Sequence, residues 1–133
     1  MASKNLKQPN ILFILSDDQG AWAMGCAGNT DINTPHLDSL ASSGIRFTNF
    51  FCTSPVCSPA RASILTGQIP SQHGVQDFIR QGNNSDLPHD ATDIEYLSGI
   101  DSYIDVLSRH GYDCGLSGKW HLGRSSKPQM NFS

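Results

Sequence analysis

The chain has 133 residues, of which 38% are hydrophobic and 16% are charged, and its formal net charge is −3. This length and composition are typical of one globular domain and exclude a disordered chain. The acidic balance argues against a nucleic-acid partner, and no apolar run is long enough to predict a membrane span.

The first part of the chain predicts a strand, a helix and a second strand. Residues 1–8 form a polar tail, and residues 9–133 are expected to form the domain. The continuous apolar run at residues 10–15 is typical of a strand buried on both faces, as in parallel sheets. A helix is expected to open at Thr34-Pro35 and to stop at Gly44. Residues 45–51 resemble another strand.

The second part of the chain continues this alternation. A helix is expected from about Pro59 to Gly67, and the polar stretch at residues 68–98 is expected to be a long loop. Residues 100–109 have helical apolar spacing and are followed by Gly111, and residues 112–116 resemble a third strand. We therefore predict an α/β fold with a mainly parallel sheet flanked by helices.

Two short segments combine residue types that are suited to ester chemistry. Cys57 stands at the start of the second expected helix, where unpaired amides form an anion site, and Arg61 lies one turn later on the same face. A nucleophile, a cation and backbone donors thus come together, as attack on a sulfate or phosphate ester requires. Asp17 and Asp18 follow the first expected strand and could bind a hard cation, although a polar turn would have the same sequence.

The same residues resemble a known family. The segment Cys57-x-Pro59-x-Arg61, followed by Leu65-Thr66-Gly67, is similar to the signature of the type I sulfatases of the alkaline phosphatase superfamily. Residues 111–121 resemble the second sulfatase signature, except that Cys114 stands where serine or threonine is usual. The resemblance covers the N-terminal portion of such an enzyme, and therefore implies the first part of an alkaline phosphatase-like sulfatase domain.

The resemblance also implies the cofactors and the roles of individual residues. In this family the cysteine is oxidised to formylglycine, an aldehyde whose hydrate is the nucleophile, by a separate maturation enzyme. The implied cation is Ca²⁺ in preference to Mg²⁺. The implied metal ligands are Asp17, Asp18 and the residue derived from Cys57. The implied catalytic residues are Cys57, Arg61, Lys119 and His121. Substrate contacts are expected from Lys119, His121 and His73, and for His73 a loop histidine bonded to the backbone is an equal alternative.

The predicted function is hydrolysis of a sulfate ester, with a sulfated sugar as the expected substrate. Because family members are several times longer, we expect this chain to be catalytically incomplete alone. A phosphonate or phosphate ester hydrolase of the same superfamily, and a non-catalytic fragment, are the alternatives. The absence of a signal peptide predicts a cytoplasmic location, or a periplasmic or secreted one if a leader is missing.

Overall fold

The computed structural model describes residues 8–79, 94–123 and 130–132, and the chain divides into two compact units. The first unit is Met1–Thr48 and the second is Asn49–Ser133. Residues 1–7 of the expected polar tail lie outside the described residues. In the described part of the chain, no helix has the length and apolar character needed to cross a membrane.

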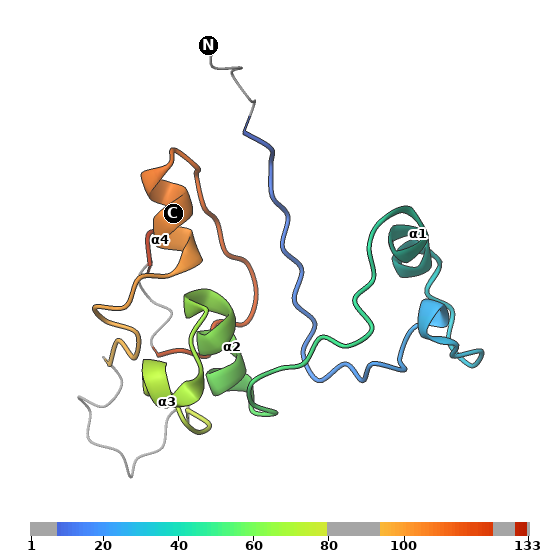
Figure 1. Ribbon diagram of the computed structural model, residues 1–133, viewed down its shortest axis with the longest axis horizontal. Helices are drawn as coiled ribbons and strands as arrows, with labels where there is room; N and C mark the ends of the chain where they lie inside the picture. The colour runs from blue at the N-terminus through green and yellow to red at the C-terminus, as the bar shows by residue number, and fades with distance from the viewer. Residues whose placement is uncertain (1–7, 80–93, 124–129, 133) are drawn as a thin grey trace. The chain divides into compact units, whose positions relative to one another are not determined.

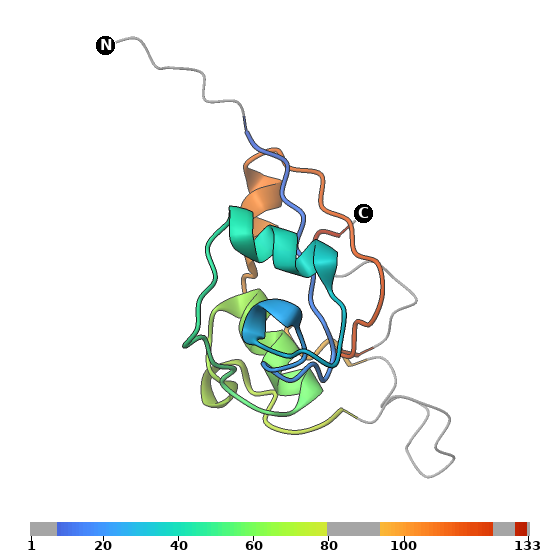
Figure 2. The same ribbon diagram turned by 90° about the vertical axis from the view of Figure 1, so that its right-hand side faces the viewer.

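In its described residues, the first unit contains a helical turn and a helix, which lie side by side (Figures 1 and 2). The turn η1 spans Gly25–Ala27 and helix α1 spans Pro35–Ser43, which confirms the helix expected after Thr34. Proline suits the first helical position because its missing N–H would have no partner there. The Asp38 carboxylate accepts hydrogen bonds from the Cys26 N–H at 2.6 Å and from the Thr34 hydroxyl at 3.0 Å. These polar contacts hold η1 against α1.

Among its described residues, the second unit contains helices α2, α3 and α4 (Figure 1). Helix α2 spans Cys57–Thr66, so Cys57 is its first residue and Gly67 follows its last. The short helix α3, Pro70–His73, lies within the expected loop at residues 68–98, and residues 80–93 of that loop lie outside the described part. Helix α4 spans Tyr103–Arg109 and begins three residues after the expected start at residue 100, because the Ser102 side chain caps it.

The core of the second unit forms around α2 and α4. Its buried hydrophobic side chains come from helices and from the segments between them: Ala62, Leu65, Val75, Ile79, Leu97, Ile104 and Leu122. Met130 and Phe132, near the C-terminus, pack against this core, and the Phe132 ring meets the edge of Trp120 at 6.1 Å between centroids. The second unit is therefore held together mainly by apolar packing.

The expected sheet is not confirmed. None of the described residues is in a strand, and this includes the three expected strands at residues 10–15, 45–51 and 112–116. The first of these was expected to be buried on both faces, yet its Leu12 side chain is 85% exposed. A strand requires a neighbouring strand that pairs with its N–H and C=O groups. An apolar run creates no such ladder by itself, so hydrophobicity predicted an element that the described residues do not form.

Candidate active site

Cys57 is the first residue of α2, as the sequence predicts. Val56 precedes it in an extended conformation and provides no side-chain cap, so the first-turn N–H groups are not satisfied by the capping side chain. Cys57 is half-buried, whereas Ser58 and Pro59 are buried. At the other end, Gly67 adopts a left-handed φ of 68° and ends the helix. The thiol thus stands at the positive end of the helix dipole.

Arg61 joins α2 to the segment that carries Lys119 and His121. Its guanidinium donates a hydrogen bond of 2.5 Å to the main-chain carbonyl oxygen of Lys119. The sequence predicted only that Arg61 would lean toward Cys57 on the same helix. The structure adds a contact between residues that are far apart in the chain, and this contact brings the two signature segments together within the second unit.

His121 is buried and held in a fixed orientation. Its Nε2 lies 2.9 Å from the carbonyl oxygen of Ile79, and the Phe78 ring meets it edge-on with 4.6 Å between centroids. Its φ of 61° is in the left-handed region, which is uncommon for a residue with a side chain. Lys119 is exposed, whereas His121 is only 5% exposed.

His73 connects α3 to α2 through both ring nitrogens. Its Nδ1 accepts the Val75 N–H at 3.1 Å, and its Nε2 lies 3.0 Å from the Ser63 hydroxyl, which also accepts from Thr53 at 2.7 Å. Because Nδ1 is an acceptor, the neutral ring carries its proton on Nε2 and donates it to Ser63. Burial lowers the pKa of His73, which favours this neutral form. Because both ring nitrogens are engaged, the hydrogen bonds favour the alternative that His73 is a histidine bonded within the fold. Contact between His73 and the substrate stays a prediction.

Asp17 and Asp18 lie in the first unit, on a bend that follows the apolar run. Both are exposed, and Asp18 has a left-handed φ of 54°, a conformation that aspartate tolerates better than most residues. Carboxylate oxygens on a bend suit a hard cation such as Ca²⁺. The residues present therefore fit the implied metal by their chemistry. Because Cys57 belongs to the second unit, a shared metal site remains a prediction.

Comparison with known proteins identifies the family. The family model described as Sulfatase matches residues 9–133. The chain belongs to the sulfatase family. It is 35% identical to human steryl-sulfatase over 131 residues, which cover 94% of this chain and 21% of that protein. It is 36% identical to the N-acetylgalactosamine-6-O-sulfatase of Bacteroides thetaiotaomicron over 130 residues, which cover 98% of this chain and 24% of that protein.

A solved structure supports the same assignment. The chain is similar to a Bacteroides fragilis protein provisionally named as the sulfatase yidJ, with a TM-score of 0.67 and 34% identity. The match covers 96% of this chain and 26% of that one. This chain therefore spans about a fifth to a quarter of the length of the relatives and of the solved structure that it matches. This likeness supports the alkaline phosphatase-like part of the predicted fold class.

Several residues around the sulfatase signatures were missed by the sequence analysis. Ser58 and Ser63 lie on α2, and both take part in hydrogen bonds that leave the helix. Ile79 contributes its main-chain groups, which every residue type possesses, so no sequence pattern could have indicated it. The sequence did offer one indication that Ser58 belongs to the site, namely its position directly after Cys57.

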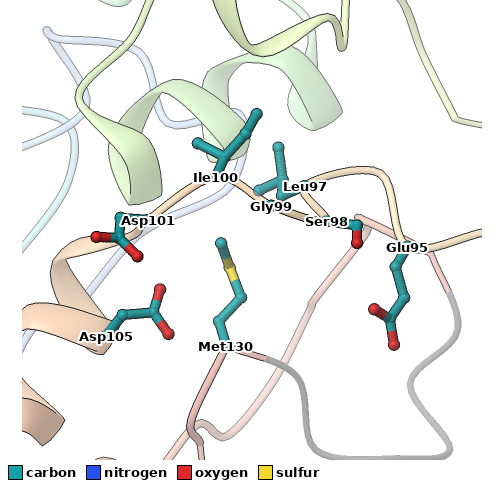
Figure 3. A pocket seen from close by; sticks show the side chains of 8 residues that line it. All are labelled: Glu95, Leu97, Ser98, Gly99, Ile100, Asp101, Asp105 and Met130. Atoms are coloured by element: carbon teal, nitrogen blue, oxygen red, sulfur yellow. The ribbon is translucent and has the colours of Figure 1, made fainter.

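A cavity of about 390 Å³ lies beside α4, and none of the predicted sulfatase site residues lines it (Figure 3). Its carboxylates include Asp101 and Asp105, which are already engaged. Asp101 pairs with Arg109 at 2.8 Å, while Asp105 accepts from the Ser102 hydroxyl at 2.5 Å and from Asn131 at 2.6 Å. The cavity therefore adds nothing to the candidate active site.

Proposed function

We propose that this protein hydrolyses sulfate esters, with Cys57 converted to formylglycine as the nucleophile. Membership of the sulfatase family supports sulfate ester chemistry in general. The observation that carries the proposal furthest is the hydrogen bond from Arg61 to the Lys119 carbonyl. This bond brings the helix that begins at Cys57 together with the segment that supplies Lys119 and His121.

The proposed cofactors are a divalent cation and the modified cysteine. Asp17 and Asp18, with the residue derived from Cys57, would hold the cation, and Ca²⁺ suits the oxygen donors better than a softer metal. When bound, the cation would supply orientation of the nucleophile and neutralisation of charge on the sulfuryl oxygens. Formylglycine would supply an aldehyde that is hydrated in water. A formylglycine-generating enzyme is therefore the proposed maturation partner.

The chain's own residues would stabilise charge and move a proton. The first-turn N–H groups of α2 and the cations of Arg61 and Lys119 are suited to the oxygens on which negative charge develops. Arg61 also fixes the main chain of Lys119, so that this segment is held against α2. His121 is buried with Nε2 bonded to a carbonyl oxygen, which leaves Nδ1 as the nitrogen able to accept a proton.

The proposed substrate class is a sulfated sugar. One relative is named for the 6-O-sulfate of N-acetylgalactosamine and another for steryl sulfates, so family membership alone leaves the alcohol open. Lys119 and His121 are the proposed substrate contacts, and His73 is a weaker candidate because both of its ring nitrogens are engaged.

We also propose that residues 1–133 expressed alone hydrolyse sulfate esters slowly or not at all. Asp17 and Asp18 are two carboxylates, whereas Ca²⁺ takes about six to eight oxygen ligands. The relatives extend well beyond the matched region, which is 21–24% of their length. Further ligands from a longer chain would complete the site.

The function is tested on the protein at the full length of its reading frame, coexpressed with a formylglycine-generating enzyme. Hydrolysis of an aryl sulfate and of an aryl phosphate is compared for the unaltered protein and for Cys57→Ser. We expect sulfate hydrolysis to be faster and to be lost in Cys57→Ser, while the exposed-cysteine control Cys52→Ser retains it. Much faster phosphate hydrolysis would instead support the phosphate ester alternative.

The metal is tested by chelation followed by readdition of Ca²⁺ or Mg²⁺. We expect chelation to abolish sulfate hydrolysis and Ca²⁺ to restore it. Asp17→Asn and Asp18→Asn should prevent this recovery, whereas Asp31→Asn, which alters an exposed carboxylate in the same unit, should not. Full activity after chelation would contradict the metal site.

A further inference from the structure

The main-chain groups of Ile79 connect the two signature segments. The Ile79 N–H donates to the hydroxyl oxygen of Ser58 at 3.2 Å, and the Ile79 carbonyl oxygen lies 2.9 Å from Nε2 of His121. Ser58 is 0% exposed, Ile79 is 8% exposed and His121 is 5% exposed. The link is therefore shielded from water, and it runs from the residue directly after Cys57 to His121.

This link determines which nitrogen of His121 carries the proton. A carbonyl oxygen can only accept a hydrogen bond, so Nε2 must be the donor to Ile79. In the neutral ring, Nδ1 is then unprotonated. Nδ1 is buried and has no hydrogen-bond partner among the described residues. Nδ1 of His121 is thus a buried acceptor. A donor other than the described residues, such as a hydroxyl group at the reacting centre, would satisfy it.

Other contacts restrict how the ring can move. The edge-on Phe78 ring and the left-handed backbone of His121 fix its plane and its direction. A 180° flip about the Cβ–Cγ bond exchanges Nδ1 with Cδ2 and Nε2 with Cε1, so it would place a ring carbon against the Ile79 carbonyl and break the hydrogen bond from Nε2. The position of that carbonyl therefore decides which nitrogen is available, and the Ser58 hydroxyl holds the residue that carries it.

We propose that Ser58 is a positioning residue, which acts through Ile79 to keep His121 as the Nε2–H tautomer with Nδ1 available as a proton acceptor. This inference rests on the proposed function, in which His121 moves a proton. Removing the hydroxyl leaves the buried Ile79 N–H without its acceptor, and the main chain at Ile79 then shifts to find another one. Nε2 of His121 is then no longer held as the donor to the Ile79 carbonyl, and the ring adopts both tautomers. Ser58 acts in this way without touching the substrate.

The test reads the His121 tautomer directly. The protein at the full length of its reading frame is labelled with ¹⁵N-histidine, and long-range proton–nitrogen correlations show which ring nitrogen is protonated. The His121 signals are assigned by their loss in His121→Gln. We expect a single Nε2–H tautomer in the unaltered protein and in Ser58→Thr, and a mixture of tautomers in Ser58→Ala. The matched control is Ser63→Ala, which removes another α2 hydroxyl that is bonded to His73 and should leave the His121 signals unchanged.

Kinetics provide a second measurement. We expect Ser58→Ala to lower kcat for an aryl sulfate by about ten- to a hundredfold with little change in KM, the range typical for loss of an outer group that orients a ligating histidine. Ser58→Thr should restore most of the loss. A purely structural role would lower the amount of folded protein without this split between kcat and KM.

The outcomes separate this inference from the proposed function. Protonation of His121 at Nδ1 in the unaltered protein, or one unchanged tautomer in folded Ser58→Ala, would overturn the positioning role even if the enzyme were an active sulfatase. The expected tautomers without sulfate hydrolysis would overturn the proposed function and leave the positioning role in place. If Ser58→Ala does not fold, Ser58→Cys takes its place, because a thiol is a weaker acceptor for the Ile79 N–H, and a single unchanged tautomer in Ser58→Cys would overturn the positioning role.

Discussion

The two units of the chain achieve order by different means. None of the described residues 8–48 is buried, whereas among the described residues of the second unit seven hydrophobic side chains are buried around α2 and α4. The first unit is nevertheless rich in apolar residues, and Ile14 in its apolar run is 75% exposed. An apolar segment is therefore buried only where other elements provide a surface on which it can pack. In the first unit, polar contacts to Asp38 hold the local structure instead.

The sharpest way to test this contrast is to truncate one leucine in each unit. Leu122 is 1% exposed and Leu12 is 85% exposed. We expect Leu122→Ala to lower the free energy of unfolding by about 2–5 kcal/mol, because it leaves a cavity in the core. Leu12→Ala should change it by about 0.5 kcal/mol or less. Urea unfolding of the 133-residue chain measures both, and equal losses would show that the apolar run in the first unit is packed.

A pH series tests the hydrogen bonds between α2 and α3. His73→Gln should cost about 1–3 kcal/mol near neutral pH, because it disturbs buried donors and acceptors. The pKa of His73 is lowered by burial from its ordinary value of 6.5. Below pH 6.5, His73 binds a proton in the unfolded chain, whereas in the folded chain it stays neutral down to its lowered pKa. The contribution of His73 to the free energy of unfolding is therefore fully present above pH 6.5, and it is lost as the pH falls toward the folded pKa. Unfolding measured across this range should show the penalty of His73→Gln shrinking in acid. A constant penalty would contradict the assigned protonation.

Removal of the Asp38 carboxylate tests the polar contacts of the first unit. We expect Asp38→Ala to destabilise the pairing of η1 with α1 by about 1 kcal/mol, since the Cys26 N–H and the Thr34 hydroxyl lose their acceptor. Amide hydrogen exchange should show faster exchange at Cys26 and unchanged exchange in α2. Asp31→Ala is the control, because Asp31 is an exposed acidic residue of the same unit. Unaltered exchange at Cys26 would show that η1 is held by something else.

The smallest effect is expected from an ion pair on the surface of the second unit. Arg109 donates two hydrogen bonds to Asp101 and lowers the pKa of that carboxyl, yet the two side chains are 55% and 72% exposed. Water and salt screen such a pair, so Arg109→Gln should leave the urea midpoint unchanged within error. A shift that approached that of Leu122→Ala would mean that charges, and not apolar packing, dominate this unit.

Local signals in the sequence were sufficient for most of the helical structure. Pro35 at a first helical position and Gly67 in a left-handed conformation mark the boundaries of α1 and α2, because each depends on a residue's own backbone preferences. The start of α4 was misplaced because the Ser102 cap sets it, and apolar spacing does not report that cap. The sheet could not be predicted in the same way, because strand formation depends on partners elsewhere.

For the candidate site, the sequence by itself determined which chemical groups are present: the Cys57 thiol at a helix start, the adjacent carboxylates of Asp17 and Asp18, and the family to which the signatures belong. Only the tertiary structure decided that Arg61 bonds to the Lys119 carbonyl and that His121 is fixed through Ile79. The physical reason is that these partners are main-chain atoms far along the chain. Every residue carries such atoms, so only the folded path of the backbone selects the ones that meet.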